Sequence, residues 1–266
     1  MEKESRLERG YKKMLEIDGE AGKKVGSSLN DISPELVKYM IEYSFGDIYS
    51  RDVLDLKSKE IGVVAALTAL GNAEPQLKVH INGALNVGCT INDVKEIILQ
   101  MTAYSGFPTA INAMNALKEV IKEREDMGIK DIAGEDSTRE VLPNERYEVG
   151  VRELAELDSN QLENLKSAYD EFSPDLVKFI VNGQADIYAR NNLNKRYREI
   201  ATISALAALG NAEPQLRFHI NAGLNVGLTA DEVKEIMLLI TIYAGFPCAI
   251  NGTNVLKEVL ASRVCL

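Results

Sequence analysis

The sequence predicts an all-α fold made of two tandem helical domains related by duplication. The first observation is an internal repeat: the segment EIGVVAALTALGNAEPQLKVHINGALNVG, which starts at Glu60, returns as EIATISALAALGNAEPQLRFHINAGLNVG from Glu199, an offset of 139 residues. The second is that helix start and stop signals divide each copy, while the alternating pattern of a β-strand is missing throughout. This period is too long for a solenoid, so it indicates a duplicated domain.

The repeat extends upstream of these segments and sets the domain boundaries. SPELVKYM at Ser33 is similar to SPDLVKFI at Ser173, and one residue of slippage follows before DIYSR and DIYAR restore the offset. Between the copies lies the polar stretch GIKDIAGEDSTREVLPN, which has little apolar periodicity. We therefore predict a first domain over residues 1–127, a linker over 128–144 and a second domain over 145–266.

The first helices of each unit follow from capping signals and from apolar content. Ser33 and the Pro-Glu pair after it resemble an N-cap, a proline at the first helical position and a first-turn acid, so we expect a helix to about Arg51. The segment Glu60–Leu70 is apolar nearly all round and is followed by the helix breaker Gly71. A helix without a polar face belongs at the centre of the unit or in a subunit contact.

The later helices of each unit are marked in the same way. The Glu-Pro pair at Glu74 starts a helix that carries a histidine and ends at Gly88. Thr90 opens the next helix, which we expect to end at Gly106, and the equivalent Thr229 begins a capping box. A proline directly after Gly106 and Phe107 starts the last helix of the unit.

The composition excludes several classes of partner. The formal net charge is −10, and such a surface would repel a phosphate backbone, which argues against nucleic acid. The sequence contains no run of about 18 apolar residues, so no membrane span is expected. The charged start MEKESRLERGYKKM lacks the apolar stretch of a secretory signal, so a cytoplasmic location is expected.

The first candidates for chemistry are Glu60 and Glu199, which we expect to begin the most apolar helix of each repeat. Apolar surroundings disfavour the charged form of a carboxyl group, which suits proton transfer. The alternative is a first-turn glutamate that stabilises the positive end of its helix.

Only two histidines occur, His80 and His219, and they stand at the same place in the two repeats. Histidine is the side chain that most often acts as an acid or base near neutral pH. A small residue three positions later, Gly83 or Ala222, leaves room beside each ring. The alternative is a histidine that only packs in the core.

The remaining candidates are two tyrosines and two arginines. Tyr104 and Tyr243 open the turns YSGFP and YAGFP, which read mainly as helix caps but could line a substrate pocket. Arg51 and Arg190 follow Asp-Ile-Tyr at a helix end. Each could grip a carboxylate with two hydrogen bonds, or could simply favour the negative end of the helix.

The cysteines do not support a duplicated thiol mechanism. Cys89 aligns with Leu228, Cys248 aligns with a threonine, and Cys265 lies at the extreme C-terminal end. No CxxC pair occurs, so neither a disulfide framework nor a metal site is indicated.

The order of these motifs resembles the carboxymuconolactone decarboxylase family of the AhpD-like superfamily. DIYxR, the Glu-led apolar helix, the histidine helix and the YxGFP turn follow one another in both copies. The resemblance implies a helical unit and a decarboxylase that needs no cofactor. Alkylhydroperoxidases of the superfamily carry CxxC just before the histidine, where this chain has Ala73 and Gln76, so a two-cysteine peroxidase mechanism is not expected.

The resemblance implies a lyase that acts on a small carboxylated, lactone-like or cyclic acid. Glu60, His80, Glu199 and His219 are the expected catalytic residues, and Arg51, Arg190, Tyr104 and Tyr243 are the expected substrate-binding residues. The alternatives are a thiol-dependent peroxidase that uses Cys89 or Cys248, and a non-catalytic binding protein. Single units of the family form rings, so a fused pair predicts a homotrimer with a pseudo-sixfold arrangement.

Overall fold

The computed structural model describes residues 4–264, apart from the side chains of residues 20, 21, 25 and 26, and confirms the all-α prediction. Helices and connecting loops account for all of the described residues, with no β-strand among them. The first repeat contains α1 (Arg6–Ile17), α2 (Gly19–Leu29), α3 (Pro34–Tyr39), η1 (Met40–Tyr49), α4 (Leu56–Leu70), α5 (Glu74–Asn86), α6 (Ile91–Met101) and α7 (Phe107–Asp126). The second contains α8 (Arg146–Leu157), α9 (Gln161–Tyr169), α10 (Pro174–Ile187), α11 (Lys195–Leu209), α12 (Glu213–Asn225), α13 (Ala230–Tyr243) and α14 (Gly245–Val264).

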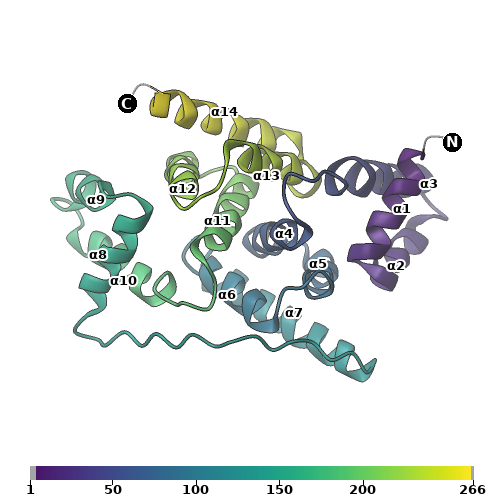
Figure 1. Cartoon of the computed structure of the whole chain (residues 1–266), viewed down its shortest axis with the longest axis horizontal. Coiled ribbons are helices and arrows are strands. Elements are labelled where there is room, and N and C mark those ends of the chain that lie inside the picture. The colour runs from purple at the N-terminus through teal and green to yellow at the C-terminus, as the bar shows by residue number, and fades with distance from the viewer. Residues whose placement is uncertain (1–3, 265–266) are drawn as a thin grey trace.

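The two most apolar helices, α4 and α11, pack against each other at the centre of the molecule (Figure 1). Nearly every residue of both helices is buried, which confirms the central position expected from their missing polar face. The backbones approach closely at Gly62, where a Cβ atom would lie 2.6 Å from Ser204 Oγ. The N-terminal helices of the two repeats lie at opposite ends of the molecule (Figure 1).

The start of the central helix differs from the prediction. Asp55 is the N-cap of α4, and its side chain accepts a hydrogen bond from the backbone N–H of Ser58. The helix therefore begins at Leu56, and Glu60 lies in its second turn, as Glu199 does in α11. The expectation that these glutamates begin their helices is wrong, because the helices already start at Leu56 and Lys195, and the alternative of a first-turn glutamate is wrong for the same reason.

The single-residue slippage between the repeats has a structural cause. In the first repeat the helix that starts at Pro34 changes from α to π geometry at Met40 and continues so to Tyr49. In the second repeat the equivalent helix is the regular α10. A π-helix accommodates more residues per turn, so it absorbs the extra residue and lets DIYSR keep the place that DIYAR has in its own repeat.

Most of the remaining helix ends agree with their signals, but α6 ends at Met101 and a turn separates it from Gly106, where we expected it to end. Gly71 caps α4 with a φ of 67°, a left-handed conformation that suits glycine. Both Thr90 and Thr229 form complete capping boxes. Residues 129–142 form an extended connection along one side of the molecule from α7 to α8 (Figure 1). Within the described range, no helix is long and apolar enough to cross a membrane.

Candidate functional site

The first candidate site is a buried cluster that joins three helices of the first repeat. Glu60 of α4 accepts hydrogen bonds from two side chains and is fully buried. Its Oε1 accepts from the hydroxyl of Tyr49 in η1 at 2.7 Å, and its Oε2 lies 3.0 Å from Nδ1 of His80 in α5. The predicted pair of Glu60 and His80 is thus brought together, and Tyr49 holds the carboxylate from the other side.

The fourth member of this cluster comes from the second repeat. Tyr243, at the end of α13, lies with its hydroxyl 2.8 Å from the hydroxyl of Tyr49. Because Tyr49 uses its proton on Glu60, Tyr243 must donate to the oxygen of Tyr49. The rings of His80 and Tyr243 meet edge to face, with their centroids 4.9 Å apart.

The second cluster repeats this arrangement with the repeats exchanged. His219 Nδ1 lies 2.9 Å from Glu199 Oε2, and the hydroxyl of Tyr188 donates to Glu199 Oε1 at 3.1 Å. Tyr104 of the first repeat reaches across and lies with its hydroxyl 2.9 Å from that of Tyr188. Each YxGFP tyrosine therefore serves the cluster of the opposite repeat.

Ion pairs to a buried glutamate hold the crossing helices in place. Glu235, on the same helix as Tyr243, is almost fully buried and accepts a hydrogen bond from Arg51 Nε at 2.7 Å. The buried ammonium of Lys59 lies 3.6 Å from Glu235 and also donates to the backbone carbonyl of Tyr49 at 3.1 Å. These contacts tie α13 to the end of η1, where Tyr49 stands.

The second repeat has the equivalent ion pairs, formed with α6 of the first. Glu96 accepts hydrogen bonds from Nε and Nη2 of Arg190 and a further hydrogen bond from the buried Arg198. Both arginines predicted to bind substrate thus already hold a glutamate of the other repeat. Neither Arg51 nor Arg190 is among the residues that line the cavity at His80, and their predicted binding of a substrate carboxylate stays a prediction.

A cavity of about 350 Å³ opens beside the first cluster. Among the described residues that line it, the polar groups are few and the walls are mainly apolar and aromatic, as in sites for small organic molecules. His80 is the one described lining residue that can carry a positive charge. Its walls come from α1, α2, α3, η1, α5 and the α13–α14 turn, and they include Met14, Asp18, Leu36, Tyr39, Tyr43, His80, Tyr243 and Phe246.

The charges around this cavity shift several pKa values. Burial lowers the pKa of His80, but the charge of Glu60, the hydrogen bond to it and the nearby Asp18 raise it by more, so the pKa ends above the ordinary histidine value. Burial, and next the charge of Glu60, raise the pKa values of Tyr49 and Tyr243 well above the ordinary tyrosine value. The cluster therefore favours a charged imidazolium beside two neutral hydroxyl groups.

The two clusters differ in the groups around the histidine. Nε2 of His219 lies 3.2 Å from the hydroxyl of Tyr104, whereas Nε2 of His80 has no such bond to the described residues. Phe218 packs its ring against His219 at a centroid distance of 4.8 Å, at the position where the first repeat has Val79. The second imidazole is therefore enclosed by protein groups, while the first faces a cavity.

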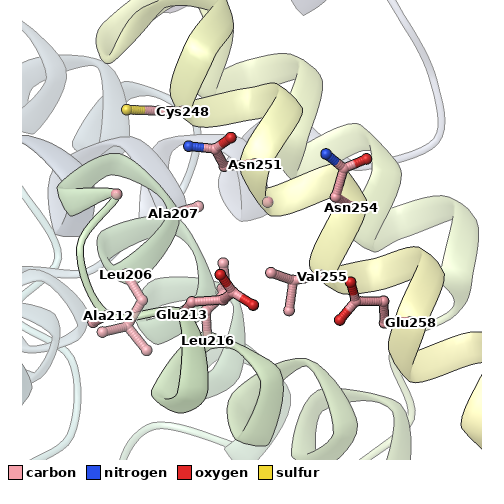
Figure 2. Close-up of a pocket in the computed structure, with 12 residues that line it drawn as sticks. Leu206, Ala207, Ala212, Glu213, Leu216, Cys248, Asn251, Asn254, Val255 and Glu258 are labelled. Carbon is pink, nitrogen blue, oxygen red and sulfur yellow. The ribbon is translucent and has the colours of Figure 1, made fainter.

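A second cavity, of about 320 Å³, lies between α12 and α14 and away from both histidines (Figure 2). Glu213 and Glu258 carry its charge, and Figure 2 shows their carboxylates facing each other across it. Arg217 forms ion pairs with both carboxylates. Both carboxylates are thus already paired with one guanidinium group, which offsets one of their two negative charges.

The cysteines are poorly placed for thiol chemistry. Cys89 is buried, and burial raises the pKa of its thiol to about 12, which leaves almost no reactive thiolate at neutral pH. Cys248 is half-buried in the wall of the second cavity, and Cys265 lies outside the described residues. No group of three His, Cys, Asp or Glu side chains that could hold a metal ion occurs within residues 4–264.

Sequence reasoning missed three residues of the clusters. Tyr49 and Tyr188 are the tyrosines of DIYSR and DIYAR, so their recurrence was the signal that could have identified them. Asp18 lies between α1 and α2, upstream of the clear repeat. Its only signal in the sequence is that Asp158 stands at the equivalent position of the second repeat, also after an apolar residue.

Comparisons with known proteins agree with this arrangement. The sequence model of the carboxymuconolactone decarboxylase family matches residues 34–119 and again residues 174–258, once in each repeat. A 4-carboxymuconolactone decarboxylase from Acinetobacter baylyi is 33% identical over 132 residues, which cover 94% of that protein and 48% of this chain. That relative therefore corresponds to about one repeat.

Two further similarities are more distant. A protein of Metarhizium robertsii named nitrosuccinic acid decarboxylase is 30% identical over 87 residues, which cover 60% of it and 33% of this chain. A solved Burkholderia xenovorans chain, described as a candidate gamma-carboxymuconolactone decarboxylase subunit, superposes with a TM-score of 0.59. It is 22% identical, and the superposition covers 97% of this chain and 98% of that one, so it shows a shared fold over both repeats.

Proposed function

This chain belongs to the carboxymuconolactone decarboxylase family, and we propose that it is a decarboxylase of a small carboxylated acid whose own carbonyl group accepts the electron pair. The observation that supports this proposal is the cluster of Glu60, His80 and Tyr243, to which both repeats contribute, beside a cavity of about 350 Å³. A lactone acid fits this description, because its ring carbonyl can hold the negative charge as an enolate.

The proposed step has a simple balance. The bond between the substrate carbon and its carboxylate breaks, CO₂ leaves, and the electron pair moves onto the carbonyl oxygen. A proton then reaches the carbon, so one proton is consumed for each CO₂. The enolate is the charge that the site must stabilise, and a fixed cation in an apolar cavity does this far better than water.

His80 is proposed to supply that cation. Glu60 binds Nδ1 and keeps the ring charged and oriented, so that Nε2 is left to face the cavity. Tyr49 and Tyr243 fix Glu60 through a chain of two hydrogen bonds. In this proposal Arg51 and Arg190 keep a structural role, because Glu235 and Glu96 already bind their guanidinium groups.

We assign the reaction to the first cluster and a supporting role to the second. The free Nε2 of His80 and the adjoining cavity support the first assignment. The bond from His219 to Tyr104 and the packing of Phe218 support the second.

The test is CO₂ release by the full chain from 4-carboxymuconolactone, whose lactone carbonyl can accept the electron pair, and from nitrosuccinate, where a nitro group would accept it in place of the carbonyl. We expect release from at least one compound, its loss in His80→Ala, and its retention in His219→Ala, with folding of each variant checked by circular dichroism. No release from either compound by folded wild-type protein would refute both substrates. Release that survives His80→Ala would refute the assignment of the site.

We also propose self-association as a trimer with a pseudo-sixfold arrangement. Exposed apolar side chains recur at equivalent positions of the two repeats, as Phe107 and Phe246 do, and Ile111 and Ile250. A patch that occurs twice per chain suits a closed ring of alternating repeats. Sedimentation that gives a stable monomer would contradict this proposal.

A further inference from the structure

Asp18 is a buried acid in the wall of the cavity beside His80. The roles proposed above for Glu60 and His80 give this acid no function. It lies between α1 and α2, lines the same cavity as His80, and is only 4% exposed. Its Oδ1 has no hydrogen-bond partner among the described residues. It stands at the N-cap position of α2 but makes no capping bond, so helix capping does not account for it.

Two glycines make room for the Asp18 carboxyl group. A Cβ atom at Gly83 would lie 3.1 Å from Asp18 Oδ1 and 3.2 Å from Glu60 Oε2, so both acids border the same small space. A Cβ atom at Gly22 would lie 2.9 Å from the Cβ of Asp18 and 3.3 Å from its Oδ2. A side chain at either glycine would therefore crowd the carboxyl group or the Cβ atom of Asp18.

The second repeat has the aspartate but not the space. Asp158 is the counterpart of Asp18, since Asn225 binds the carbonyl of Leu157 as Asn86 binds that of Ile17. Ala222 stands in place of Gly83, and Leu162 in place of Gly22. The carboxylate of Asp158 is half-buried and binds the backbone N–H of Asn160 instead.

The groups that face Asp18 come from three other helices. Burial raises the pKa of Asp18 to about 7, the charge of His80 lowers it, and the charge of Glu60 raises it. The charge of Asp18 also contributes to the raised pKa of Tyr243, at the end of α13. Below about pH 7 a carboxyl group that still holds its proton thus lies beside an imidazole whose own pKa is raised, and acid catalysis requires such a proton donor next to a cation.

We propose that Asp18 is a further catalytic residue of the first cluster, the acid that protonates the substrate carbon after CO₂ has left. This inference rests on the decarboxylation proposed above. The O–H bond of Asp18 breaks as the new C–H bond forms, and the electron pair on the carbonyl oxygen of the enolate returns to the carbon. The Asp18 carboxylate then takes a proton from water in the cavity.

The first experiment needs no substrate. NMR of full-length protein labelled with ¹³C at aspartate carboxyl groups should show one carboxyl that titrates near pH 7, and Asp18→Asn should remove that signal. Gly83→Ala should move the same titration to lower pH, because the added methyl displaces the carboxyl group from its buried position. An Asp18 signal that titrates in the ordinary aspartate range would overturn the proposal.

The second experiment measures CO₂ release against pH for wild type, Asp18→Asn, Gly83→Ala and the matched control Asp158→Asn. We expect Asp18→Asn to lower kcat by about 100-fold or more with little change in KM, and to remove the fall in kcat above neutral pH. Asp158→Asn should keep the wild-type profile. An Asp18→Asn variant with the wild-type kcat and pH profile would overturn the donor role. A wild type that releases no CO₂ from either compound would instead refute those two substrates, while the titration still decides whether Asp18 is the buried acid of the site.

Discussion

The sharpest test of the assignment compares Glu60→Gln with Glu199→Gln. Both glutamates are fully buried and make the same two contacts, one to a tyrosine hydroxyl and one to histidine Nδ1, at 2.7 and 3.0 Å for Glu60 and at 3.1 and 2.9 Å for Glu199. The two substitutions therefore cause the same local loss, and they differ only in the cluster that they change.

The expected loss of stability is similar in both variants. Glutamine keeps one acceptor oxygen but presents an NH₂ group where the carboxylate accepted its second hydrogen bond. The change replaces a hydrogen bond to a charged group, worth about 1.5–3 kcal/mol, by a neutral one worth about 0.5–1.5 kcal/mol, so the free energy of unfolding should fall by roughly 1 kcal/mol. Urea denaturation of the two variants measures this cost.

The expected effect on activity differs. In Glu60→Gln the amide donates to Nδ1 and leaves His80 neutral, so its pKa falls from the raised value that the carboxylate maintains. Loss of the cation should reduce kcat for CO₂ release by about 100- to 1000-fold. Glu199→Gln should keep the wild-type kcat. Equal losses in the two variants would refute the assignment of the reaction to the first cluster alone.

The pH dependence of stability gives an independent check. The folded pKa of His80 lies above the unfolded value, so its pairing with Glu60 stabilises the fold fully below the ordinary histidine pKa of 6.5. That contribution disappears as the pH rises through the folded pKa. In Glu60→Gln the corresponding fall in stability should be smaller. The chain has two histidines, so NMR can follow each ring separately.

Three further predictions follow from the structure. Tyr243→Phe should reduce activity and Tyr104→Phe should not, because Tyr243 crosses to the first cluster; the opposite result would mean that each tyrosine serves its own repeat. Cys89 should react with iodoacetamide far more slowly than Cys248 in peptide mass spectrometry, since its thiol is buried with a pKa of about 12; equal rates would contradict that burial. The raised pKa of Asp18 should make the protein less stable as the pH rises from about 4 to about 7, by at most about 4 kcal/mol, and Asp18→Asn should flatten this slope in urea denaturation.

The sequence by itself determined the helical class, the duplication and the central helix. These features depend on local signals, such as the Gly71 cap and the threonine capping boxes. They also depend on an apolar pattern without a polar face, which requires the central helix to be buried. The sequence also singled out Glu60 and His80, which the structure brings into contact, as candidates for chemistry. Their spacing in the chain did not predict contact, but their joint recurrence in both repeats did single them out.

Only the tertiary structure decided how the repeats share their sites. Tyr243 and Tyr104 exchange between clusters because α13 and α6 pack against the central helix of the opposite repeat, a contact that no local pattern encodes. For the same reason Arg51 meets Glu235, a residue 184 positions away in the chain. The space that buries Asp18 comes from Gly22, four residues later in the chain, and from Gly83 on α5, so its burial depends on tertiary packing as well as on a neighbour in sequence.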